Sequence, residues 1–341
     1  HYTDLLKGSF GFVIMISCIL SLVVQINVWR VVCISGMHGQ DIANKLLPGL
    51  GILLSLLIGA GGIVFTIGNV GGGALGFQTL FGLPQPVGIL ITGIIAIGIF
   101  LIPNATKAMD MISKILGIST IVIIFVIILV VHPPFGTALK ETFLPSAGIS
   151  DLGDGIRTLL GGTVGGYITF AGAHRLLDAN ITGKENEKQI TSSSVMGIII
   201  ASVVRILLFL AVLGVVSASS GLILDESNPA SDAFRRGAGE IGYRLFGIIL
   251  LSASVTATIG CSYTTISFIK TLHPWLEKHT RLITGLFIGL CTFLMFVIGR
   301  PANLLILAGT LNGLIIPLIL VICLVGATRS DIMGKSYKHP R

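Results

Sequence analysis

The sequence predicts an all-α membrane protein, a bundle of apolar helices of which one is interrupted. Of its 341 residues, 53% are hydrophobic and only 11% are charged, whereas charged residues make up about 25% of an ordinary soluble domain. The mean hydropathy of +0.95 is typical of chains whose helices lie in lipid. The net charge of +7 comes from Lys and Arg scattered through short polar connections, without the clustered basic surface of a nucleic-acid-binding protein. We therefore expect the lipid bilayer, and no nucleic acid, as a partner.

Nine apolar stretches have the length that a bilayer-crossing helix needs, about 20 residues. Short polar connections separate most of them, and prolines such as Pro103 and Pro301 stand where helices are expected to stop. Because the connections are short, we expect residues 1–341 to form a single bundle. The predicted spans are 11–33, 49–75, 87–103, 110–131, 155–179, 192–216, 244–269, 282–299 and 303–327.

The stretch 155–179 differs from the others because it contains the glycine pairs Gly161-Gly162 and Gly165-Gly166. A glycine disfavours a helix interior by about 1 kcal/mol relative to alanine, so this span is predicted to be interrupted. At membrane depth an interrupted backbone is tolerated only where it is packed in protein or lines a cavity, and transporters use such helices to bind their cargo. The alternative is close glycine packing between unbroken helices.

The place of the interrupted helix in the chain predicts an internal repeat. Five helices run from it onward and four precede it, while many secondary transporters consist of two inverted repeats that each begin with a broken helix. The predicted organisation is an incomplete first repeat at 1–131 with helices 2 to 5, a second repeat at 155–327 with helices 6 to 10, and a tail at 328–341. On this interpretation the first helix is missing from this chain, and HYTDLLK is the end of its outer half. The alternative is a true nine-span protein.

The distribution of Lys and Arg predicts which end faces the cytoplasm. If the connection at 34–47 is cytoplasmic, most basic residues lie on the cytoplasmic side, and the positive-inside rule then also places the C-terminus there. That side holds Arg30, Lys45, Lys107, Lys114, Arg175, Lys184, Lys188, Lys270, Lys278, Arg281, Arg329, Lys335, Lys338 and Arg341, and the other side holds Lys7, Lys140, Arg157, Arg235, Arg236, Arg244 and Arg300.

Two ionisable residues stand out within or beside the spans. Arg205 lies in the middle of 192–216, where an unpaired charge is costly. It is either a counter-ion for an anionic substrate, or part of a proton path, or half of an ion pair between helices. His174 follows the interruption and could relay protons near neutral pH, although a solvated residue near the interface fits the sequence equally well.

Small and polar side chains form a stripe along the second span. Gly62, Thr66, Asn69 and Gly73 follow helical spacing and share one face, which is either a polar wall of the transport pathway or a packing seam. The same alternatives hold for Ser252, Thr256, Gly260 and Tyr263, and for Gln25, Asn27 and Asn312.

Signatures of metal, redox or catalytic chemistry are missing from the spans. No Asp or Glu lies in the middle of a span, no Met lies in the interrupted one, and no two histidines share a helix face, so the metal ligands stay unknown and no cofactor is expected. The five cysteines lie in apolar runs without a C-x-x-C pair, as small packing residues do. We also expect no enzyme, since no nucleophile and base share one membrane depth.

Four stretches resemble parts of the Nramp family of proton-coupled divalent metal transporters, which share a LeuT/APC-like inverted-repeat fold. SLVVQINVWRVVCISGMHGQDIA is similar to the family's second helix and the loop after it, and GNVGGGALGFQTLFG to the end of its third. LLGGTVGGYITFAGAHR is similar to its broken sixth helix, and LNGLIIPLILVICLVGATRSDIMG to its tenth. The resemblance implies a secondary transporter in a bacterial plasma membrane that carries a divalent metal ion in symport with protons.

The chain departs from the family at the residues that usually hold the metal. The family's first-helix Asp-Pro-Gly-Asn has no counterpart, and its sixth-helix Met-Pro-His-Asn is replaced by the residues at 165–168. Acidic residues of the third helix fall near Thr66 and Asn69, and a tenth-helix Gln falls near Gly309. A substituted site of this kind could still accept a hydrated hard ion such as Mg²⁺.

The sequence thus predicts an ion-coupled carrier whose cargo binds beside the interruption. The first alternative is a carrier of a small organic acid or amino-acid-like solute, which a neutral site near Arg205 would suit. The second is a non-transporting membrane protein. The residues predicted to bind cargo are Gly165, Gly166, Tyr167, Thr169, Thr66 and Asn69, and those predicted to act in coupling or as counter-ion are Arg205 and His174.

Overall fold

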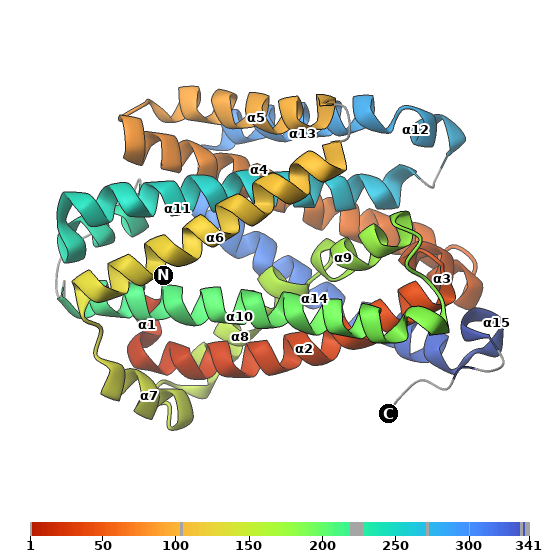
Figure 1. The fold of residues 1–341 in the computed structure, drawn as a ribbon, viewed down its shortest axis with the longest axis horizontal. Coiled ribbons are helices and arrows are strands. Elements are labelled where there is room, and N and C mark those ends of the chain that lie inside the picture. The colour runs from red at the N-terminus through yellow and green to blue at the C-terminus, as the bar shows by residue number, and fades with distance from the viewer. Residues whose placement is uncertain are drawn as a thin grey trace.

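The computed structural model describes residues 2–102, 105–218, 228–270, 273–299, 301–334 and 337, and this part of the chain is a bundle of helices without strands. The long helices run roughly along the longest axis of the molecule (Figure 1). Pro103 and most of 335–341, predicted as a helix end and part of the tail, lie outside the described residues. The α-helices are α1 Tyr2–Leu6, α2 Phe10–Ser35, α3 Gly39–Leu46, α4 Leu50–Phe81, α5 Gln85–Leu101, α6 Ala105–Val131, α7 Phe135–Phe143, α8 Ile149–Val164, α9 Tyr167–Asp178, α10 Glu187–Ala218, α11 Pro229–Ile269, α12 Pro274–Lys278, α13 Thr280–Ile298, α14 Pro301–Thr328 and α15 Ser330–Met333, and two short 3₁₀ helices are Lys7–Ser9 and Lys184–Asn186.

The helices account for the nine predicted spans. Within the described residues, seven helices are long and apolar enough to cross a membrane, and α5 is a shorter apolar helix. The pair α8 and α9 supplies the interrupted span. The predicted all-α membrane fold is therefore confirmed.

Helix α11 is longer than the sequence predicts. It begins at Pro229, whereas the predicted span begins at 244, so the predicted start is wrong. Asn228 caps it by accepting a hydrogen bond from the backbone nitrogen of Ser231, at 3.4 Å, and proline is favoured at the first helical position. The backbone leaves helical geometry at Ala238 and Gly239. The polar first part is therefore a capped, kinked extension of the span that a hydropathy pattern does not reveal.

Helix α4 lies against α11 along a row of small residues. Cβ atoms on Gly72 and Gly76 would lie 2.5 Å from the Ser254 hydroxyl and 2.8 Å from the Leu251 Cβ, which are separations that real Cβ atoms do not reach. Gly73 approaches Thr92 of α5 just as closely. These contacts support the packing interpretation for the Gly73 end of the stripe, because close backbone approach requires glycine.

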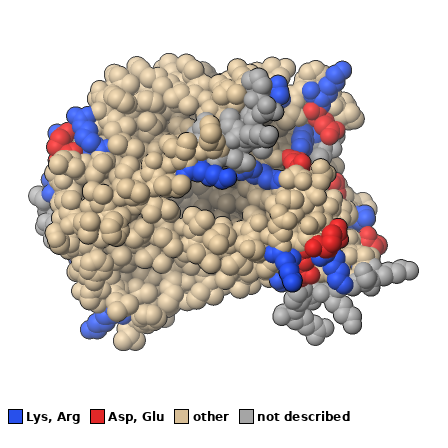
Figure 2. All heavy atoms as spheres, viewed as in Figure 1, with Lys and Arg blue, Asp and Glu red and all other residues tan. Residues whose placement is uncertain are grey.

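The surface has the charge pattern of a membrane protein. Charged side chains gather mainly at the two ends of the long axis, and the surface between them is largely made of other residues, apart from Lys or Arg atoms beside a central hollow (Figure 2). Large apolar side chains are exposed there, among them Ile118 and Val122 of α6 and Leu286 of α13. An apolar belt between charged ends matches a hydrocarbon core between two polar interfaces.

Candidate functional site

The predicted interruption lies between α8 and α9. Gly165 is extended, with φ −78° and ψ 146°, and Gly166 has φ 51° and ψ −119°. The second conformation is open to glycine and strained for other residues. Two half-helices therefore meet at a two-residue break, and the first amides of α9 have no partner within that helix.

Asn312 of α14 faces this break. Its side chain is fully buried, and its amide nitrogen donates to the carbonyl of Ala308, at 2.9 Å. Its Oδ1 has no hydrogen-bond partner among the described residues, and Cβ atoms added to Gly166 or Gly61 would overlap that oxygen. The structure therefore holds an unpaired acceptor at the interruption. The sequence shows Asn312 only as a lone polar residue in an apolar span, which is the one signal that could have found it.

A second polar cluster joins α4, α9 and α11 around a cysteine. Thr66 donates to Cys261 Sγ at 3.1 Å, the Cys261 thiol lies 3.2 Å from the carbonyl oxygen of Gly62, and the Tyr167 hydroxyl also bonds to Cys261. The Tyr167 ring packs edge-on against Phe65, with centroids 5.4 Å apart. The structure thus brings Thr66 and Tyr167, both predicted to bind cargo, into one cluster through a cysteine that we interpreted only as a packing residue.

Asn69 and Thr169 are also buried beside this region. The Asn69 amide nitrogen and the Thr169 hydroxyl lack hydrogen-bond partners in the part of the chain that the structure describes. Asn69 is three residues from Thr66 and so lies on the same face of α4. Thr169, two residues from Tyr167, points about 200° away around α9. Tyr167 and Thr169, both predicted to bind cargo, therefore lie on two different sides of one half-helix.

His174 lies in a buried contact of α9 with α11 and the start of α3. Its Nδ1 is 2.8 Å from the Ser267 hydroxyl, and the Gly39 backbone nitrogen donates to its Nε2 at 3.4 Å. The rings of His38 and Phe268 each lie 4.8 Å from the His174 ring, centroid to centroid. Because Nε2 accepts, Nδ1 carries the proton and donates to Ser267. The side chain is fully buried, so the solvated alternative is wrong.

His38 beside it gives a test of this contact. Burial lowers the pKa of His38 below its ordinary 6.5, and Lys270 lowers it further, while Asp41, Asp178 and Glu277 oppose the shift. His38 therefore binds a proton more readily in the unfolded chain than in the folded protein. The free energy of unfolding falls as the pH drops through 6.5 toward the lowered pKa of His38 in the folded state. We expect thermal unfolding in detergent from pH 8 to 5 to lose stability less steeply in His38→Asn. The control His132→Asn, at an exposed histidine, should keep the wild-type slope, and equal slopes in all three proteins would contradict the assignment.

Arg205 of α10 lies against α2. It is partly buried, and its guanidinium is hydrogen-bonded to Cys18. Cys18, together with Ser202 and Ile206 on either side of Arg205, lines a largely apolar cavity of about 490 Å³. The structure thus places the Arg205 side chain at the contact of α2 with α10, and its role as counter-ion stays a prediction.

The match to a known family extends over nearly the entire chain. Residues 9–340 match the family described as natural resistance-associated macrophage protein-like, or Nramp. The chain belongs to the Nramp family. The resemblance predicted from the four sequence stretches is therefore confirmed, and the chain is an integral membrane transporter of the Nramp type, whose family-level substrate is a divalent metal ion.

Relatives and solved structures agree with this assignment. The chain is 52% identical to the membrane protein YcsG of Bacillus subtilis (strain 168) over 99% of its own length and 82% of that protein. It is 46% identical to a membrane protein of Haemophilus influenzae, over 99% of its own length and 84% of that protein. Its fold is similar to the crystal structure of the Eremococcus coleocola manganese transporter bound to an aromatic bis-isothiourea compound. The TM-score is 0.73 and the sequence identity is 18%, and the match covers 100% of this chain and 78% of that chain. The structure of a histidine-to-alanine variant of that transporter matches with a TM-score of 0.71 and 17% identity. This match covers 99% of this chain and 76% of that chain.

The Nramp chain offers neutral groups at its break. Among the described residues, no three His, Cys, Asp or Glu side chains come close enough together to hold a metal ion. The groups that do converge are the Asn312 amide, the Gly165-Gly166 backbone and the cluster of Thr66, Cys261 and Tyr167. They provide oxygen acceptors and one thiol, without a fixed negative charge.

Proposed function

We propose that this Nramp protein carries a divalent metal ion across a bacterial plasma membrane and binds it at the break between α8 and α9. The observation that carries the proposal is the unpaired Oδ1 of Asn312, buried against Gly166 and Gly61. A buried acceptor without a donor costs about 1–3 kcal/mol, and a bound cation or its water would supply the missing partner. The bacterial relatives support the membrane assignment.

The ligand chemistry favours an ion that accepts oxygen ligands. Amide and backbone carbonyl oxygens suit Mn²⁺ and Mg²⁺, and Mg²⁺ in particular keeps several of its water molecules when bound. A hydrated ion needs fewer direct protein ligands, and hydroxyls such as that of Thr66 can bond to its water. The structurally similar protein of Eremococcus coleocola is a manganese transporter.

Transport would follow from the two half-helices. Helix C-termini carry partial negative charge and N-termini partial positive charge, so the end of α8 attracts a cation at the break. Rocking of one helix group against the other would open the site alternately to each side. For proton coupling we propose His174, because its ring links α9, α11 and the start of α3. The positive charge of Arg205 would raise the electrostatic potential near α2.

Metal uptake into proteoliposomes tests the binding site. Asn312→Leu, close in size but without the amide oxygen, is expected to lower uptake of Mn²⁺ or Mg²⁺ at least about tenfold, because losing a charge-assisted contact costs roughly 1.5–3 kcal/mol. Leu311→Ala, at the neighbouring partly exposed position, should transport like the wild type. Unchanged uptake by a folded Asn312→Leu protein would remove Asn312 from the site.

Ligand-dependent thermal stability separates metal from organic cargo. A solute at about 100 times its Kd stabilises the folded state by roughly 2.7 kcal/mol. We expect Mn²⁺ or Mg²⁺ to stabilise both the wild type and Arg205→Ala. A panel of small carboxylates should have no effect. Stabilisation by a carboxylate that disappears in Arg205→Ala, with none by metal, would favour the organic-solute alternative.

A further inference from the structure

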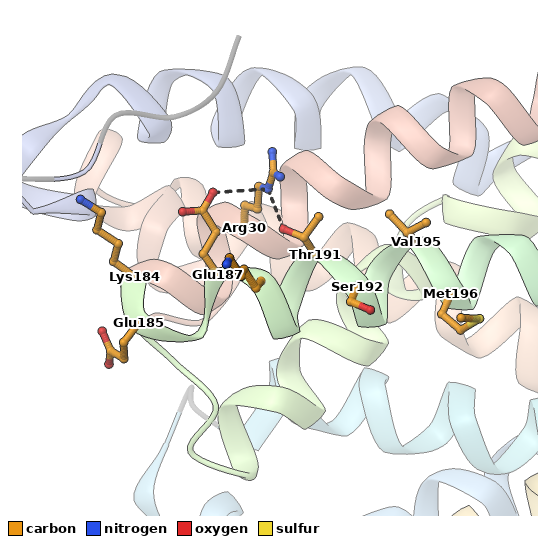
Figure 3. Close-up of a pocket in the computed structure, with 9 residues that line it drawn as sticks. Arg30, Lys184, Glu185, Glu187, Thr191, Ser192, Val195 and Met196 are labelled. Atoms are coloured by element: carbon orange, nitrogen blue, oxygen red, sulfur yellow. Dashed lines mark hydrogen bonds and ion pairs between the residues drawn. The ribbon is translucent and has the colours of Figure 1, made fainter.

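A cavity of about 850 Å³ opens between the end of α2 and the start of α10. The positive-inside rule assigns this end of the bundle to the cytoplasm, so the cavity lies at the inner membrane interface. Its lining changes from charged at the interface to apolar further along α10 (Figure 3). The lining residues are Arg30, Lys184, Glu185, Glu187, Lys188, Thr191, Ser192, Val195 and Met196.

The charged end of the cavity is held in place by Arg30. Its Nε lies 3.0 Å from the Thr191 hydroxyl and 3.9 Å from the Glu187 carboxylate, and Figure 3 shows these three side chains pointing toward one another. Glu187 is further engaged by the Tyr337 hydroxyl. The single N–H of Nε donates to Thr191, and Glu187 lies at ion-pair distance, while the terminal nitrogens of Arg30 make no hydrogen bond within the described residues. They remain as a donor pair on a side chain that is only 19% exposed.

The other charges favour an anion in this cavity. Lys184 and Lys188 add two positive charges, and Glu185 opposes them. Together with Arg30 the lining has three positive charges against the two negative charges of Glu185 and Glu187, which leaves an excess of one positive charge. Arginine presents paired N–H groups that match a phosphate, so the expected ligand group is a phosphate rather than a cation.

The apolar end of the cavity continues along a lipid-facing stripe. Val195 and Met196 lie about two turns beyond Lys188 on α10, and Met196 is 54% exposed. Ile199 and Val203 extend the exposed apolar surface toward the membrane centre. A ligand that places a phosphate at Arg30 therefore has room for a hydrocarbon chain beside it. A soluble phosphate would leave this stripe uncovered.

We propose that this cavity binds one anionic phospholipid of the inner leaflet, with its phosphate at Arg30 and Lys188 and an acyl chain along Met196. Basic pockets between helices at this interface suit anionic headgroups, because positive charge near such a membrane gains energy from the negative lipid surface. The lipid would bridge α2 and α10, which hold the Arg205 contact with Cys18 at a deeper level.

Native mass spectrometry of the full chain in mixed micelles tests the site. With phosphatidylglycerol as probe we expect one retained lipid, and with phosphatidylcholine much weaker retention. Lys188→Gln should weaken phosphatidylglycerol retention about fivefold, and Arg30→Gln further, since each basic residue near the surface contributes a similar increment. Lys188 is exposed, so this variant tests the site even if Arg30→Gln fails to fold. Lys140→Gln, at the opposite end of the bundle, should match the wild type.

Three results would overturn the lipid assignment. The first is equal retention of phosphatidylglycerol and phosphatidylcholine, and the second is unchanged retention in Lys188→Gln. The third is displacement of the lipid by millimolar glycerol 3-phosphate, which carries the same phosphate without acyl chains and would reveal a site for soluble anions. The expected result is that glycerol 3-phosphate leaves the retained lipid in place. Lipid retention is measured without metal uptake, so a failure of the lipid proposal can be distinguished from a failure of the proposed function.

Discussion

Replacing Gly161 by alanine is expected to destabilise the protein more than any other single change considered. A Cβ atom there would overlap the carbonyl oxygen of Gly309 and lie 2.5 Å from the backbone nitrogen of Gly313. Both neighbours are backbone atoms of α14, so neither can swing aside, and α8 must move away from α14. Overpacking a tight interior costs about 1–3 kcal/mol, occasionally more, and we expect the upper end of this range. Thermal unfolding in detergent measures the loss.

The adjacent residue provides a matched control for this prediction. Gly162 belongs to the same helix, but a Cβ atom there would have no neighbour within 4 Å. Gly162→Ala should therefore keep wild-type stability or gain slightly, because alanine is the better helix former by about 1 kcal/mol. If Gly161→Ala unfolds at the same temperature as Gly162→Ala, then α8 and α14 are not in backbone contact.

Replacing Gly166 by alanine is expected to abolish transport while leaving much of the fold intact. Its φ of 51° and ψ of −119° strain any residue with a side chain, at a cost of about 1–3 kcal/mol, and the new methyl group would overlap Oδ1 of Asn312. Both effects reshape the break where we propose that cargo binds. Uptake of Mn²⁺ or Mg²⁺ into proteoliposomes should fall to background.

Stability must be followed beside uptake to interpret Gly166→Ala. Circular dichroism should show a helical protein with a lower melting temperature. The control Gly289→Ala lies in α13, where a Cβ atom would meet nothing within 4 Å, and should transport normally. Normal uptake by Gly166→Ala would mean that the break is a packing feature, which is the alternative that the sequence left open.

The interruption could be predicted because its signal is local. Two glycine pairs within one apolar stretch disfavour a continuous helix wherever the chain folds, and the structure places the break at Gly165-Gly166. The start of α11 was missed, since the cap at Asn228 lies in a polar stretch that hydropathy assigns to a connection. The joining of Thr66 to Tyr167 through Cys261 could not be predicted either, because it unites three helices far apart in the chain.

The sequence by itself determined that this is an all-α membrane transporter of the Nramp family with one broken helix. Those properties follow from composition, hydropathy and glycine spacing, together with the four family-like stretches, all of which are read along the chain. Only the tertiary structure decided that Asn312 faces the break, that His174 is buried against His38, and that Arg205 lies against Cys18. The physical reason is that the sequence of an apolar span reveals the length of the helix but not how the helix is rotated about its own axis. Which polar side chain faces protein is settled by the close packing of neighbouring helices through their small residues.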